Sequence, residues 1–188
     1  MTGIPEHFPI DSALQDRLIA HCKTMQHFGF IDGASTPTIY DVDRLTFDTD
    51  DEIVNTRKGL VLAVASAVHA VRSARGLDTL SYVTRRSGPM GAPTFASAVG
   101  RMVDLPTAQI DPRHRLIRER LREKVPSDSK VIIMTDMTVT GHELIQGARV
   151  LWDRNIRGVT AITVFEQGEE AREALDAHAI PLTSLIQV

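Results

Sequence analysis

Apolar residues recur along this 188-residue chain with two different spacings. A spacing of three or four predicts a first helix that begins after Asp11 and Ser12 and ends at Gly29. Its inward positions would be Leu14, Leu18, Ile19, Cys22 and Met25. After Gly59, an apolar stretch rich in alanine runs from Leu60 to Val71 and predicts a buried helix. Further helices are predicted over residues 112–124, 141–153 and 169–178.

Shorter apolar runs predict strands between these helices. They cover residues 38–47, 51–55, 80–86, 131–134, 159–165 and 182–188. Strands that alternate with helices favour an α/β fold with a mostly parallel sheet flanked by helices on both faces. Ligands bind such sheets at the carboxyl ends of the strands. The loops after Val54, Val83 and Met134 are therefore the candidate binding loops.

Residues 87–110 interrupt this alternation. They are rich in glycine, proline, alanine and serine and show no clean period. We therefore expect a long loop there, and loops of that length in compact domains are usually functional or disordered.

Composition narrows the function classes. With 43% hydrophobic and 24% charged residues, the chain is typical of one globular domain. Its formal net charge of −3 argues against broad affinity for nucleic acid or membrane surfaces. The basic segment from Arg113 to Lys124 also carries acids, which is typical of a solvated helix face, so nucleic acid is an unlikely partner.

The cysteine, the histidines and the N-terminus bear on disulfides, metal sites and location. Cys22 is the one cysteine, so no internal disulfide can form, and its apolar context indicates a buried structural thiol. The seven histidines show no HxxxH or HExxH spacing typical of metal sites. The N-terminus lacks the pattern of a signal peptide, and the run from Leu60 to Val71 is shorter than the roughly 20 residues that span a bilayer. We expect a cytoplasmic protein without a membrane segment.

The stretch VIIMTDMTVTGHE, from Val131 to Glu143, carries the clearest chemistry. A buried strand leads past Asp136 into a Thr-Gly turn and then a helix. Backbone amides and the positive helix end converge in such turns, which suits a phosphate. Asp136 could bind a ligand or act as a turn former. His142 could donate to a phosphate or lie exposed at the helix start.

Together with RKGLVLA (57–63), FGFIDGASTPTIYDVDRL (28–45) and the C-terminal segment from Phe165, this stretch resembles the type I phosphoribosyltransferases. Within that family it is most similar to orotate phosphoribosyltransferase, over roughly residues 28–188. The resemblance implies one domain over residues 1–188, with residues 1–36 forming an N-terminal helix and a hood on the base side. It also implies a homodimer and binding of 5-phosphoribosyl-1-pyrophosphate (PRPP) with Mg²⁺.

The resemblance also implies roles for individual residues. Asp136, beside Thr135, would hold the ribose hydroxyls and reach Mg²⁺ indirectly through the substrate. The 5′-phosphate would lie on Thr138, Val139, Thr140, Gly141 and His142. The pyrophosphate would contact Arg57, Lys58 and Gly59, with Arg85 or Arg86 as further cations at the reacting end. The loop over residues 87–110 would close over the site.

The sequence departs from the family's pattern in places that bear on function. Thr135 stands where a first acid would be, and the stretch after Tyr82 lacks the catalytic lysine and histidine. No cation stands at 32–35 or 165–167, where orotate would be bound. Two hypotheses follow. The protein transfers ribose 5-phosphate to a nitrogenous base other than orotate, or it is a non-catalytic regulator that binds PRPP or a nucleoside monophosphate.

Overall fold

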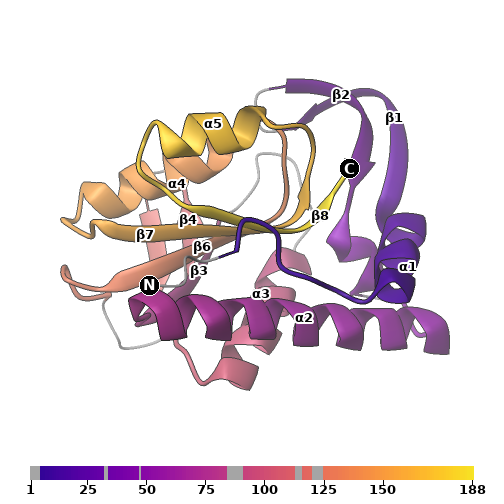
Figure 1. The fold of residues 1–188 in the computed structure, drawn as a ribbon, viewed down its shortest axis with the longest axis horizontal. Helices are drawn as coiled ribbons and strands as arrows, with labels where there is room; N and C mark the ends of the chain where they lie inside the picture. The colour runs from indigo at the N-terminus through magenta and orange to yellow at the C-terminus, as the bar shows by residue number, and fades with distance from the viewer. Residues whose placement is uncertain (1–4, 32–33, 47, 84–90, 113–115, 120–124) are drawn as a thin grey trace.

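The computed structural model describes residues 5–31, 34–46, 48–83, 91–112, 116–119 and 125–188. Its main sheet has six strands in the order β5-β4-β3-β6-β7-β8 (Figure 1). The strands are β3 (Thr79–Val83), β4 (Thr107–Asp111), β5 (Leu116–Glu119), β6 (Lys130–Thr138), β7 (Gly158–Glu166) and β8 (Leu182–Gln187). β5 runs antiparallel to β4, and the other pairs are parallel. The predicted α/β fold with a mostly parallel sheet is confirmed.

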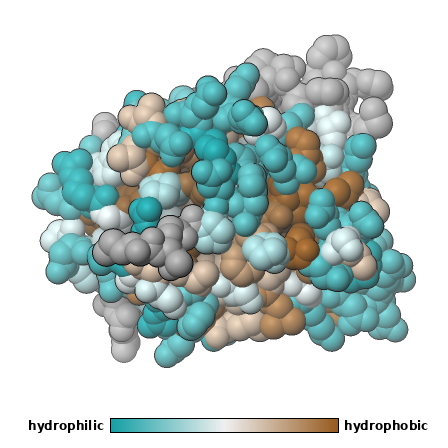
Figure 2. All heavy atoms as spheres, viewed as in Figure 1, coloured by the Kyte–Doolittle hydropathy of each residue, from teal (hydrophilic) through white to brown (hydrophobic). Residues whose placement is uncertain are grey.

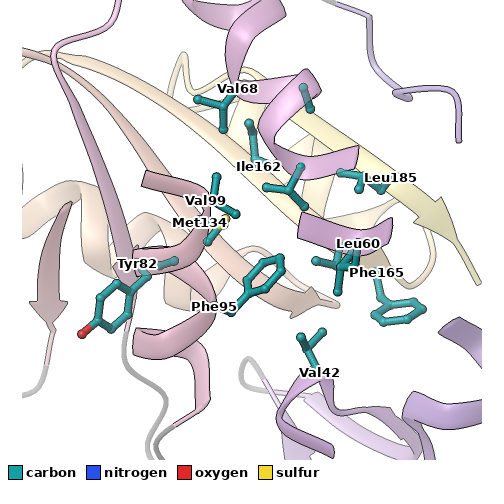
Figure 3. Packing of buried hydrophobic residues seen from close by; sticks show 14 of the residues in the cluster. Val42, Leu60, Val68, Tyr82, Phe95, Val99, Met134, Ile162, Phe165 and Leu185 are labelled. Carbon is teal, nitrogen blue, oxygen red and sulfur yellow. The ribbon is translucent and has the colours of Figure 1, made fainter. Parts of the chain in front are cut away.

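Helices cover both faces of this sheet (Figure 1). On one face, α2 (Asp51–Arg75) and α3 (Gly91–Val103) bury a core that includes Leu60, Val68, Phe95, Val99, Met134 and Ile162 (Figure 3). On the other face, α4 (His142–Trp152) and α5 (Glu170–Asp176) close a second core with Ile133, Leu144, Leu151, Val159 and Leu175. Burial of both faces explains why the central strands are almost continuously apolar.

A small N-terminal unit stands beside the sheet. It consists of α1 (Ser12–Cys22), the antiparallel hairpin of β1 (Lys23–Ile31) and β2 (Ala34–Tyr40), and the short 3-10 helix η1 (Val42–Leu45). Asp11 caps α1, because its Oδ1 accepts the Leu14 N–H at 3.0 Å. The predicted extension of this helix to Gly29 is wrong, since pairing with β2 draws the chain into a strand after Cys22. The predicted strand over 38–47 is correct only as far as Tyr40.

The predicted strand over residues 51–55 is also wrong, because these residues form the first turns of α2. The Asp50 carboxylate caps this helix by accepting the Glu52 N–H at 2.9 Å, and acidic residues in the first turn suit the positive helix end. Gly59 does not interrupt α2. A Cβ there would lie 2.8 Å from Leu14 Cδ1, so the glycine permits the close approach of α1.

The long loop expected over residues 87–110 is wrong from Gly91 onward, where the chain forms α3 and then β4. Pro93 lies in the first turn of α3, where a missing N–H costs nothing. Gly100 lets the helix lie against the next strand, since a Cβ there would be 2.3 Å from Thr107 Cγ2. Residues 87–90 lie outside the described residues.

The helix predicted over residues 112–124 is wrong at 116–119, which form β5. Pairing with β4, as in Ile110 opposite Ile117, overrides the helical spacing. Most of the remaining predicted helix lies outside the described residues. By contrast, β3, α4, β7, α5 and β8 lie close to their predicted positions. No helix in the described part of the chain is long and apolar enough to cross a membrane.

Candidate functional site

The carboxyl ends of the parallel strands meet at one edge of the sheet, and the β1–β2 hairpin stands over this edge (right in Figure 1). Two contacts hold the hairpin there. The rings of Tyr40 and Phe165 stack with centroids 4.6 Å apart. The Tyr40 N–H donates to Met137 Sδ at 3.4 Å. The hairpin is therefore attached to the ends of β6 and β7, a long-range arrangement that no local sequence signal indicated.

Asp136 lies near the end of β6, as predicted, and its side chain is only partly exposed. Its Oδ1 accepts the Met137 N–H at 3.1 Å, and the Thr135 hydroxyl lies 3.4 Å away. Thr135 is buried, and its hydroxyl also lies 3.3 Å from the Met137 carbonyl oxygen. These local contacts orient a carboxylate at the edge of the sheet, where it can accept hydrogen bonds from hydroxyl groups.

Cys22, at the end of α1, faces the same region. Burial raises the pKa of its thiol from 9.0 to about 12, and the carboxylates of Asp136 and Asp41 add to the increase. A thiol with this pKa stays protonated at neutral pH and is a poor nucleophile. The predicted burial of Cys22 is confirmed.

The turn after β6 joins the strand to the start of α4. The buried Thr138 hydroxyl accepts the Gly141 N–H at 3.2 Å, and the His142 N–H lies 3.4 Å from the Thr140 hydroxyl. Gly141 has φ +73°, a conformation that favours glycine. His142 is exposed at the helix start. Hydroxyls, amides and the positive end of an 11-residue helix thus meet in one turn, which suits an anion.

The end of β7 is tied to this turn. The Gln167 N–H donates to the Thr138 carbonyl at 3.0 Å. The preceding residue, Glu166, is completely buried, and its Oε2 lies 2.6 Å from Arg172 Nη2. This ion pair has no signature in the sequence, because its partners are six positions apart across a loop and this spacing matches no helical or strand period.

Arg57, Lys58 and Gly59 do not form the expected turn after a strand, since all three lie within α2. Arg57 Nη1 donates to the carbonyls of Leu45 and Thr46 at 3.1 and 2.7 Å, so this guanidinium anchors η1. Lys58 is exposed. Arg57 and Lys58 line an apolar hollow of about 440 Å³ formed by η1, α2 and α3. Their proposed contact with pyrophosphate stays a prediction.

Arg85 and Arg86 lie outside the described residues. The strand before them, β3, pairs with β6 and places Tyr82 opposite Met134. This strand therefore ends at Val83, at the same edge as Asp136.

The side chains around Asp136 suit a metal ion that the substrate, rather than the protein, mainly holds. Within the described ranges, no three His, Cys, Asp or Glu side chains gather into a metal site. Mg²⁺ in phosphate-processing sites typically uses one or two carboxylates together with phosphate oxygens and waters. The partly exposed Asp136 carboxylate fits that requirement.

Neither a protein-family model nor a curated protein sequence matches the chain. Solved structures do. UMP synthase from Leishmania donovani is 19% identical with a TM-score of 0.66; the match covers 94% of this chain but only 36% of that one. Orotate phosphoribosyltransferase from Mycobacterium tuberculosis, in complex with PRPP, is 14% identical with a TM-score of 0.64 and 94% coverage of both chains.

Adenine phosphoribosyltransferase from Leishmania donovani is 14% identical with a TM-score of 0.69, over 97% of this chain and 84% of that one. Enzymes named for two different bases thus share this architecture. These matches extend over 94–97% of this chain. The chain has the fold of the type I phosphoribosyltransferases.

Proposed function

We propose that this protein transfers ribose 5-phosphate from PRPP to a nitrogenous base other than orotate and releases pyrophosphate. One observation carries the proposal. Asp136 and the turn from Thr138 to His142 lie together at the carboxyl edge of the sheet, between the end of β6 and the start of α4. A carboxylate beside an anion-binding turn matches a sugar with a phosphate on its 5′ carbon.

In this proposal the Asp136 carboxylate accepts hydrogen bonds from the ribose hydroxyls. The turn holds the 5′-phosphate through the amides and hydroxyls of Thr138, Val139, Thr140, Gly141 and His142. The bond from C1 to the pyrophosphate oxygen breaks, and the base nitrogen forms the new bond to C1. This nitrogen then loses its proton to solvent or to the leaving pyrophosphate. The chain contributes mainly positioning and charge stabilisation.

Positive charge at the leaving group is the second requirement. Arg85 and Arg86 follow β3 and are our first candidates for this role, with Arg57, Lys58 and Gly59 as further candidates. Mg²⁺ bound to PRPP would offset part of the pyrophosphate charge, with Asp136 supporting it through the substrate.

The acceptor base would lie between the end of β7 and the N-terminal hairpin. Glu166 and Gln167 occupy the end of β7, and Arg172 is already paired with Glu166. An orotate carboxylate buried there would lack a cationic partner, which is costly. Gln167 instead suits a base with neutral amide or amino groups.

We also propose that residues 1–188 act as one domain, with residues 1–36 contributing to the hood over the base. As the resemblance implies, the active form would be a homodimer, and we propose the cytoplasm as its location.

One observation favours a non-catalytic alternative. The Thr135 hydroxyl is buried near the Met137 carbonyl and contributes no negative charge beside Asp136. A chain with a single carboxylate there could bind PRPP or a nucleoside monophosphate as a regulator, without turnover.

Titration calorimetry with PRPP and Mg²⁺, repeated with ribonucleoside monophosphates, tests the binding step. We expect saturable binding that Asp136→Asn weakens by about tenfold or more, equivalent to roughly 1.4 kcal/mol. Asp16→Asn removes an exposed carboxylate on α1 and serves as the matched control. Absence of PRPP binding by the wild-type protein would contradict the transferase, and binding of a ribonucleoside monophosphate in its place would support the regulator.

A second measurement separates the transferase from the regulator. Pyrophosphate release is followed with PRPP, Mg²⁺ and each member of a panel of purine and pyrimidine bases. Release with one base, lost in Asp136→Asn and kept in Asp16→Asn, supports the transferase. Tight PRPP binding without release for any base supports the regulator.

A further inference from the structure

A second hollow lies at the opposite edge of the sheet, where β6 and β7 begin (left in Figure 1). Its volume is about 400 Å³, within the usual range of small-molecule sites. It lies between the end of α2, the start of β6 and the start of β7, and hydrophilic residues cover much of this end of the molecule (Figure 2). We call it the basic pocket, because Arg75, Lys130 and Arg157 line it and no carboxylate does.

Lys130 is fixed in this pocket. Its Nζ donates to the Arg75 carbonyl at 2.6 Å, at the end of α2. Its N–H donates to Asp78 Oδ2 at 2.7 Å, which places one carboxylate just outside the lining. A Cβ on Gly76 would lie 3.2 Å from Lys130 Nζ, and one on Gly158 would lie 3.1 Å from Lys130 Cγ. The two glycines therefore form a slot that orders the lysine chain.

Arg75 and Arg157 are exposed, as Lys130 is, but they differ from it in their hydrogen bonding. Within the part of the chain that the structure describes, neither guanidinium makes a hydrogen bond or ion pair. Each offers a planar set of N–H donors that matches phosphate oxygens. Three cations from three separate segments thus converge on one concave surface of a chain whose formal net charge is −3.

We propose that the basic pocket binds a small phosphorylated metabolite through its phosphate or diphosphate group, with Arg75 and Arg157 as direct ligands and Lys130 as a fixed positive charge. This site is separate from the candidate site around Asp136. Lys130 and Thr138 are the two ends of β6, about 26 Å apart at roughly 3.3 Å per residue. One small ligand cannot occupy both sites, so the occupant of the basic pocket acts as a second ligand.

Amide NMR of ¹⁵N-labelled protein during titration with inorganic pyrophosphate, at constant ionic strength, tests this proposal. Glycine amides are well dispersed and report each site separately. Gly76 and Gly158 line the basic pocket, whereas Gly141 reports the turn before α4. We expect Gly76 and Gly158 to shift along saturable curves, whether or not Gly141 responds.

Arg157→Gln and Arg75→Gln should each weaken this pyrophosphate response by about tenfold, the loss expected for one charged hydrogen-bonding group. Arg149→Gln removes an exposed cation on α4, outside the pocket, and should leave it unchanged. The proposal fails if Gly76 and Gly158 do not shift saturably. It also fails if their response survives in both pocket variants. Neither result depends on whether PRPP binds at Asp136.

Discussion

The carboxylate of Glu166 is completely buried and lies 2.6 Å from Arg172 Nη2. The same guanidinium donates to the Leu182 carbonyl at 3.1 Å and the Glu6 carbonyl at 3.3 Å. His7 joins the group, with its Nδ1 2.7 Å from the Ser184 hydroxyl. Arg172 therefore connects the end of β7, β8 and the N-terminal segment. Because Gln167 follows Glu166, this connection also positions the edge of the candidate site.

Removing Arg172 should leave an uncompensated buried charge. We expect Arg172→Met to lower the free energy of unfolding by about 3 kcal/mol, measured by urea denaturation. Arg149→Met, an exposed change on α4, should cost far less. The double variant Glu166→Gln with Arg172→Met should recover part of the loss. Equal stability of Arg172→Met and Arg149→Met would contradict this role for the ion pair.

Gly141 and Gly168 offer a matched pair of substitutions, since their φ angles are +73° and +70°. A Cβ on Gly141 would lie 3.0 Å from the Ala171 carbonyl oxygen, whereas one on Gly168 would meet nothing within 4 Å. Gly168→Ala should therefore lower the free energy of unfolding only by the strain of a left-handed backbone at alanine, about 1–2 kcal/mol. Gly141→Ala should cost more.

Gly141→Ala should also weaken PRPP binding, because it displaces the turn from α5, while Gly168→Ala should not. Thermal unfolding and calorimetry measure the two effects. Indistinguishable results for the two variants would argue against a turn held tightly on α5.

Gly100 tests the contact between α3 and β4, which form where a long loop was predicted. A Cβ on Gly100 would lie 2.3 Å from Thr107 Cγ2. Gly100→Ala should gain helix propensity but lose more through overpacking, for a net cost of about 1–2 kcal/mol. Adding Thr107→Ser removes the nearest methyl group and should restore part of the stability in urea denaturation. If Thr107→Ser restores no stability, the strain lies elsewhere, such as at the Leu105 carbonyl oxygen, 3.1 Å from the added Cβ.

The raised pKa of Cys22 predicts a dependence of stability on alkaline pH. The unfolded thiol ionises near 9.0, whereas the folded thiol ionises near 12. The folded state therefore retains the proton that the unfolded state releases. The contribution of Cys22 to stability is complete below pH 9 and declines as pH rises towards 12.

Comparison with Cys22→Ala isolates this effect. We expect the stability difference between wild type and variant to change above pH 9 and to stay constant below it. Iodoacetamide at pH 8 should modify Cys22 only in denaturant. Rapid alkylation of the native protein at that pH would contradict the burial of this thiol.

The sequence by itself determined the chain from Val131 onward well. In the run from Val131 to Glu143, strand, acid, turn and helix follow one another within short range. The strands after α4 and α5 are short runs rich in buried apolar residues. Polar turns bound them, so local pattern and tertiary burial agree there. The same agreement carried the expectation of an α/β fold and the placement of Asp136 at the edge of the sheet.

Only the tertiary structure decided the elements whose stability depends on distant partners. Gly59 reads as a helix boundary, yet it lies within α2, where it permits Leu14 of α1 to pack closely. Residues 116–119 have helical spacing, yet β4 pairs with them as a strand. The hairpin position depends on Tyr40 meeting Phe165. In each case a contact made after the chain has folded back outweighs a local preference of about 1 kcal/mol or less.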